Sequence, residues 1–221
     1  EIKEEALVIN VADFSRFLEL AGHLNGQILN LENISRDVGK YGTTVSTWFQ
    51  ILIDTLLGTY IFPYRPGFKV RETSHPKFYL FDCGVARGCA GLLTENLDSL
   101  WQGCAFESVI LNELSIYNEI SKKNRNIYFY DSPGCGEIDF IVETKRKTID
   151  QISEFISIEV KASKKWKRSF ETPSRSLKDY SKGRHVKMLG VYLGLERLSF
   201  DGFEVYPLKD FVIQLHKGMF F

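Results

Sequence analysis

The sequence predicts a chain of mixed α+β / α/β class that is divided into two domains. In the first part, segments with apolar residues at helical spacing are followed by two short runs of β-forming residues. In the second part, the order is helix, three strands, helix and strand, which is typical of a mixed sheet flanked by helices. With 221 residues and 44% hydrophobic content, the chain can build two cores. We therefore expect domains at 1–91 and 103–221, joined by a linker at 92–102.

The first domain is predicted to begin with helices. The apolar spacing places them at residues 13–22, 30–38 and 43–56. Asp13 is expected to cap the first helix, and Thr43 or Thr44 the third, because their side-chain oxygens can accept a hydrogen bond from a free amide of the first turn. A short helix, a glycine-containing turn and a longer helix form the outline of a helix-turn-helix.

A hairpin is predicted to follow the third helix. Residues 60–64 and 77–81 are rich in aromatic and β-branched side chains and are separated by a loop with proline and glycine. Paired antiparallel, they would complete a winged helix-turn-helix. Trp48, Phe49 and Leu52 are expected to form the core beneath this hairpin, because apolar residues at helical spacing usually face a core.

This first domain offers a surface that fits nucleic acid. In a DNA-binding winged helix, the exposed face of the third helix enters the major groove. The side chains placed to do so are Lys40, Thr43, Thr44, Ser46 and Thr47. Because this face carries one lysine and no arginine, a winged helix used for protein packing is an equally favoured alternative.

The second domain is predicted to have an αβββαβ order with a mixed sheet. Its helices are expected at 103–121 and 174–180, and its strands at 126–130, 137–142, 155–162 and 187–193. The tail adds residues 203–207 and a final helix at 208–216. Asp139 opens an apolar run of the kind expected for a strand covered on both faces.

Three charged residues on two of these strands indicate a metal site. Glu159 and Lys161 are two apart, so they project from the same face of their strand. Carboxylates beside a buried strand need positive charge, and Mg²⁺ takes oxygen ligands from one or two carboxylates. We expect the carboxyl groups of Asp139 and Glu159 to lie close enough to share such an ion, and at least one to have a raised pKa. The alternative is a solvated strand face with a weak ion pair.

Two neighbouring features strengthen this hypothesis. Glu107 lies at the margin of the apolar stripe of the preceding helix, where it can face the sheet as a third carboxylate. Downstream, a basic run interrupted by Trp166 suits a phosphate backbone next to the site. Its members beyond Lys161 are Lys164, Lys165, Lys167 and Arg168. A solvated loop is the alternative interpretation of this run.

The order of a helix Glu, a strand Asp and a strand Glu-x-Lys resembles the PD-(D/E)XK nuclease superfamily. More closely, the chain resembles the C-terminal domain of unknown function that follows the ATPase module in many bacterial and archaeal AAA+ proteins. This resemblance extends over nearly the whole chain, through Phe14 to Leu20, Gly26 to Asn30, Val45 to Leu52 and Lys77 to Val85. In two places the chain departs from the pattern. Ile138 stands where the proline of the motif's name would be, and Asp131 follows a strand that often carries an arginine.

The resemblance implies a restriction-endonuclease-like second domain that hydrolyses phosphodiester bonds of nucleic acid, with DNA favoured. Asp139, Glu159 and Glu107 would ligate Mg²⁺ or Mn²⁺, and Lys161 would complete the catalytic set. It also implies an N-terminal AAA+ ATPase module as partner in the parent protein. The chain itself has no Walker A motif, so ATP would act only through that module. The alternative is a catalytically inactive module that docks DNA or protein and regulates the ATPase.

The composition limits the class of protein and its partners further. The formal net charge is zero, so any nucleic-acid contact must come from a local patch. The four cysteines form no Cys-x-x-Cys pair, and reduced thiols in a cytoplasmic protein explain them best. No apolar run has the length of a membrane span, and we expect no membrane partner. The sequence leaves the oligomeric state and the target sequence open.

Overall fold

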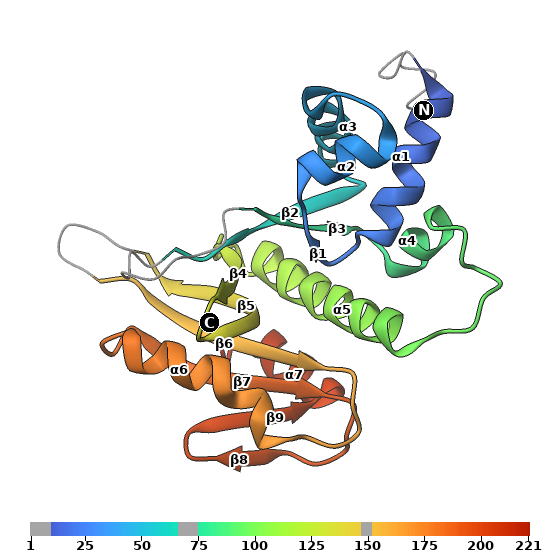
Figure 1. Ribbon diagram of the computed structural model, residues 1–221. Coiled ribbons are helices and arrows are strands. Elements are labelled where there is room, and N and C mark those ends of the chain that lie inside the picture. The colour runs from blue at the N-terminus through green and yellow to red at the C-terminus, as the bar shows by residue number, and fades with distance from the viewer. Residues whose placement is uncertain (1–9, 66–74, 147–151) are drawn as a thin grey trace. The chain divides into compact units, whose positions relative to one another are not determined.

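The computed structural model describes residues 10–65, 75–146 and 152–221 (Figure 1). The chain is of mixed α/β class and divides into two compact units. Of the described residues, the first unit contains 10–61 and 75–98, and the second contains 62–65, 99–146 and 152–221.

The first unit contains four helices and three strands among its described residues. In chain order they are α1 (Val11–His23), β1 (Gln27–Ile28), α2 (Leu31–Val38), α3 (Gly42–Asp54), β2 (Gly58–Pro63), β3 (Lys77–Leu80) and α4 (Cys83–Cys89). The last two residues of β2 belong to the second unit. Two predicted caps are wrong. Asn10 caps α1, because its extended backbone lets the side-chain oxygen accept from the amide of Asp13. Helix α3 has no side-chain cap, and the carbonyl of Tyr41 already accepts from the amide of Thr44.

The predicted antiparallel hairpin of the first unit is confirmed with shifted bounds, because residues 58–61, and not 60–64, pair with residues 77–80. Strands β2 and β3 pair antiparallel with Tyr60 opposite Phe78, and β1 adds a third strand on the other side of β3. The Phe49 ring lies beneath this hairpin, with its centroid 4.9 Å from that of Phe78. Trp48 instead packs on Phe17 of α1, at 5.4 Å. Aromatic contacts therefore join the helices and the hairpin in one core.

Helix α4 was not predicted. Asp82 caps it by accepting from the amide of Val85 at 2.9 Å. The helix packs closely against α1 at Gly22, where an added Cβ would come within 2.5 Å of the Ala86 carbonyl oxygen. The predicted linker at 92–102 is shorter in the structure, because the first helix of the second unit already begins at Ser99.

The second unit follows the predicted order of a helix, three strands, a helix and a strand. Its elements are α5 (Ser99–Ile120), β4 (Ile127–Ser132), β5 (Gly136–Lys145), β6 (Glu154–Lys161), η1 (Arg168–Glu171), α6 (Thr172–Tyr180), β7 (His185–Tyr192), β8 (Leu198–Phe200), β9 (Phe203–Pro207) and α7 (Leu208–His216). The single-turn helix η1 and the short strand β8 were not predicted. Both lie in segments without clear periodicity.

These strands form a mixed sheet in the order β4, β5, β6, β7, β9, β8. Strand β6 pairs antiparallel with β5 and parallel with β7, and β7 pairs parallel with β9. Helix α6 contacts β5 and β7, with Leu177 packed among Ile141 and Phe155, and lies in front of the strands in Figure 1. Helices α5 and α7 are joined by Glu113 and His216, 2.9 Å apart. None of the helices in the described part of the chain is long and apolar enough to cross a membrane.

Candidate metal and phosphate site

Asp139 lies where strands β5 and β6 stop pairing. The backbone register between them ends with Phe140 opposite Ile158. One residue further, the carboxylate oxygen Oδ2 of Asp139 accepts the backbone amide of Val160 at 2.7 Å. This buried amide is therefore satisfied by a side chain instead of a strand carbonyl, and the charged acceptor strengthens the bond. The position of the Asp139 carboxylate is fixed by the same interaction.

Glu159 and Lys161 lie on the neighbouring strand β6 and form a charged centre with Asp139. The Lys161 ammonium Nζ lies 2.5 Å from Oε1 of Glu159 and 3.6 Å from Oδ2 of Asp139. The two carboxylates thus share the Lys161 ammonium. As the sequence predicted, they are not on opposite faces of the sheet. Both acidic residues are buried, with 5% of Asp139 and 3% of Glu159 exposed.

The charges of this centre shift its pKa values. Burial, followed by the nearby charge of Asp139, raises the pKa of Glu159 well above its ordinary value, and Lys161 offsets part of this. The predicted raised pKa of one carboxyl group is therefore confirmed. Burial acts to lower the pKa of Lys161, but Asp139, Glu159 and Glu107 outweigh it and raise that pKa. Lys161 consequently stays protonated at neutral pH.

One oxygen of this centre has no hydrogen-bond partner among the described residues. It is the buried Oε2 of Glu159, which receives no donor from residues 10–65, 75–146 or 152–221. A buried acceptor without a partner is costly, and a hard cation with oxygen ligands satisfies it. Mg²⁺ commonly binds through one or two carboxylates and keeps several waters, so Asp139 and Glu159 fit such an ion.

Glu107 takes a looser place in this centre. It lies on α5, half-buried, and its charge contributes to the raised pKa of Lys161. The described residues nevertheless contain no group of three or more His, Cys, Asp or Glu side chains that could hold one ion together. The structure thus brings Asp139, Glu159 and Lys161 into contact and leaves Glu107 within electrostatic range.

The members of the predicted basic run have different partners. Lys164, Lys165 and Lys167 are exposed, and within the described residues no acidic side chain pairs with them. Arg168 is already engaged. It lies 3.0 Å from Glu171 and 2.7 Å from Asp201. The three lysines are therefore available to phosphate, whereas Arg168 is held in a structural cluster.

Sequence reasoning missed this cluster around Glu171. Glu171 is fully buried and accepts from the indole Nε1 of Trp166 at 3.2 Å and from Nη2 of Arg175 at 2.5 Å. Arg175 also donates to the carbonyl of Phe200 in β8, at 2.6 Å. A Glu and an Arg four residues apart are most often a surface pair on a helix. Here Glu171 is buried and Arg175 half-buried, and the contact of Arg175 with Phe200 depends on β8, which was not predicted.

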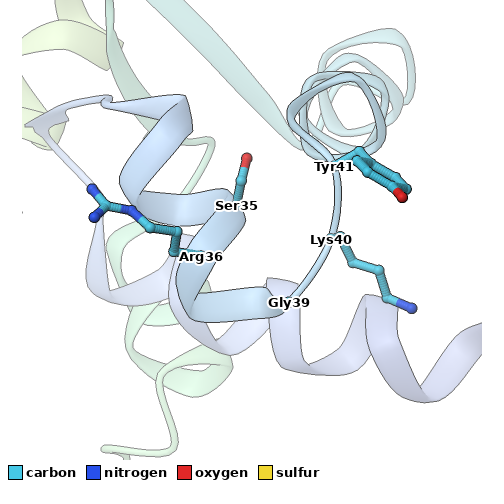
Figure 2. A pocket seen from close by; sticks show the side chains of 5 residues that line it. All are labelled: Ser35, Arg36, Gly39, Lys40 and Tyr41. Carbon is cyan, nitrogen blue, oxygen red and sulfur yellow. The ribbon is translucent and has the colours of Figure 1, made fainter.

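The predicted nucleic-acid surface of the first unit is partly engaged. Lys40 lies 2.5 Å from Asp13 of α1, whereas Thr43, Ser46 and Thr47 are exposed. Figure 2 shows the pocket between α2 and α3, with Lys40 and Tyr41 pointing away from Ser35. This pocket has a volume of about 440 Å³ and is lined by Ser35, Arg36, Gly39, Lys40 and Tyr41. The one lysine of the predicted surface is therefore neutralised by a neighbouring helix.

Comparisons with known families agree with a chain of two parts. Residues 1–96 match the profile of a domain of unknown function, DUF8612, and residues 102–211 match another, DUF4143. The second family is commonly found in proteins associated with AAA ATPases. No curated protein and no solved structure is significantly similar to the chain.

Proposed function

We propose that the second unit is a metal-dependent phosphodiester hydrolase with a restriction-endonuclease-like fold, acting on nucleic acid. The observation that carries this proposal is the buried oxygen Oε2 of Glu159, which has no partner in the described part of the chain and lies in a centre with Asp139 and Lys161. An acceptor of this kind beside a second carboxylate favours a bound cation. The helix, three-strand, helix and strand order around the centre supports the fold.

In this proposal Asp139 and Glu159 would hold Mg²⁺ or Mn²⁺, with Glu107 contributing through water. The ion, when bound, would lower the pKa of a coordinated water and polarise the phosphate. Asp139 keeps its place because the Val160 amide donates to it. Without a metal ion, Lys161 offsets the charge of the carboxylates. With the ion bound, Lys161 would orient the attacking water and stabilise negative charge on the phosphate. Lys164, Lys165 and Lys167 bind the neighbouring phosphates.

The parent protein would supply an AAA+ ATPase. The support is the match of residues 102–211 to a family common in AAA-ATPase-associated proteins. We assign a winged-helix role to the first unit, because its helices α2 and α3 are followed by a hairpin that β1 extends. The ion pair of Lys40 with Asp13 favours protein packing for this unit over reading of a DNA groove.

The test is a cleavage assay with the Asp139→Asn variant. The amide oxygen of Asn can still accept from Val160, so the fold should be kept while a charged ligand is lost. We expect no Mg²⁺- or Mn²⁺-dependent cleavage of nucleic acid by this variant and nearly unchanged affinity, since affinity comes mainly from lysine contacts to phosphate. Asp179→Asn, at an exposed position on α6, is the matched control and should cleave like wild type.

Replacement of Lys164, Lys165 and Lys167 by Ala should weaken binding instead. Wild-type protein that cleaves neither DNA nor RNA with either metal would overturn the hydrolase. If it also binds neither, the second unit is better explained as a module that docks onto the ATPase.

A further inference from the structure

The single-turn helix η1 places an aromatic ring beside the candidate centre. The centroid of the Phe170 ring lies 5.8 Å from the ammonium of Lys161 and 6.0 Å from that of Lys167. Phe170 is half-buried, so part of its side chain faces solvent. An aromatic ring thus lies next to both Lys161 of the centre and Lys167 of the basic run.

The position of this ring is supported by its packing on Trp166. Trp166 meets Phe170 edge to face, with the centroids 5.4 Å apart and the rings at 83°. Trp166 itself is fixed by its hydrogen bond to the buried Glu171. It also lies so close to Gly190 that an added Cβ there would come within 2.5 Å of the indole ring. The Glu171 cluster therefore holds a fixed platform at the edge of the site.

The combination of ring and cations matches one kind of ligand. An aromatic face next to lysines is the arrangement with which proteins bind single-stranded nucleic acid, since bases stack on the ring and phosphates contact the cations. A nucleotide supplies both groups at once. In a duplex, the faces of each base are covered by its neighbours, so a stacking platform favours an unpaired base.

We propose that Phe170 is a stacking platform for an unpaired nucleobase next to the reacting phosphate, and that single-stranded nucleic acid is the preferred ligand of the second unit. This inference rests on the proposed phosphodiester hydrolase function. Lys167 contacts the phosphate of the stacked nucleotide, and Lys164 and Lys165 contact phosphates further along the strand. A purely structural role, in which Phe170 only covers Trp166, requires an apolar side chain but not an aromatic one.

The test measures binding of short fluorescent strands to the full chain in EDTA, where no metal-dependent cleavage occurs. The probes are an oligothymidylate, an oligouridylate, an abasic strand with the same phosphates, and a blunt DNA duplex. Phe170→Leu should weaken binding of the base-bearing strands about 5- to 100-fold and leave the abasic strand unaffected. Phe170→Trp should bind like wild type. Lys167→Ala should weaken binding of base-bearing and abasic strands alike.

Three results would overturn the platform. They are equal binding by Phe170→Leu and wild type, an equal loss on the abasic strand, and a wild-type preference for the duplex. The Asp139→Asn cleavage assay separates the two proposals, because it tests the hydrolase independently of base stacking. A hydrolase that depends on Asp139 but not on the aromatic ring would refute only the platform.

Discussion

Two buried glutamates of the second unit show how differently the same side chain can be used. Glu171 receives donors on both oxygens, from Trp166, Arg168 and Arg175. Glu159 shares a single ammonium with Asp139 and has one oxygen without a partner. Burial is nearly complete for both. The number of donors separates the two residues, because the fully paired carboxylate holds elements together, whereas the underpaired one is the cation ligand of our proposal.

This difference has a consequence for the fold around each residue. The Glu171 cluster links η1 and α6 to the β8–β9 hairpin, since Arg168 contacts Asp201 and Arg175 contacts Phe200. The Glu159 centre lies where β5 and β6 stop pairing and links fewer elements. Stability should therefore depend strongly on one carboxylate and weakly on the other.

The largest effect on stability is expected for Glu171→Ala. The substitution leaves Arg175 without its buried partner and removes the acceptor of the Trp166 indole. We expect the free energy of unfolding to fall by about 3–5 kcal/mol, which is the usual cost of removing one partner of a buried ion pair. Urea unfolding followed by circular dichroism measures it. Glu159→Gln is the control and should not lower stability, because it removes a charge that burial disfavours and leaves Lys161 with Asp139 as partner. Equal losses in both variants would refute the contrast.

The pH dependence of the free energy of unfolding is the next test of the contrast between Glu171 and Glu159. The buried His185 contributes to the same pH dependence and has to be separated from it. His185 stacks on Phe155, and its Nε2 is hydrogen-bonded to the hydroxyl of Ser157 at 2.8 Å. Burial lowers its pKa from 6.5 to about 4. The unfolded chain therefore binds a proton below pH 6.5 that the folded chain takes up only near pH 4. Between pH 7 and pH 4 we expect His185 to reduce the free energy of unfolding by about 3 kcal/mol.

The contribution of Glu159 has the opposite sign. Its raised pKa means that the folded chain keeps a proton at pH values where the unfolded chain has lost it. Its contribution to stability is therefore present below pH 4.5 and is lost as the pH rises through the folded-state value. In a His185→Phe background, Glu159→Gln should flatten the remaining change of the free energy of unfolding with pH. A slope that persists in the double variant would assign the effect to another group.

A smaller effect is expected from divalent metal. If Asp139 and Glu159 hold Mg²⁺, a concentration ten times the dissociation constant should raise the free energy of unfolding by about 1.4 kcal/mol. Thermal unfolding with and without Mg²⁺, at constant ionic strength, measures it. The increase should vanish in Glu159→Gln and persist in Asp179→Asn. Stabilisation of both variants to the same degree would place the ion elsewhere.

The smallest effect concerns the salt dependence of nucleic-acid binding. For a single strand, each phosphate that the protein no longer neutralises lowers the slope of log affinity against log salt by about 0.7. We expect this change for Lys165→Ala, whose ammonium is exposed and has no acidic partner in the described part of the chain. Arg168→Ala should leave the slope unchanged, because Glu171 and Asp201 already neutralise this arginine. Identical changes in the two variants would show that the ion pairs of Arg168 open on binding.

Local pattern was sufficient for much of the candidate site. Glu159 and Lys161 share a face because side chains alternate along any strand, and the buried run after Asp139 indicated a central strand. The final helix was also predicted with its observed bounds, Leu208–His216. In each case the deciding interactions are those of neighbours along the chain.

The tertiary structure decided which charges are free. Nothing near Arg168 in the sequence indicates Asp201, and nothing near Lys40 indicates Asp13, because both pairs join segments far apart in the chain. The burial of Glu171 and the place of Phe170 beside Lys161 likewise depend on how the loop after β6 folds against β7 and β9. The sequence by itself thus determined which side chains share a strand face. Only tertiary packing determined their partners and their exposure to solvent, since both depend on contacts between distant segments.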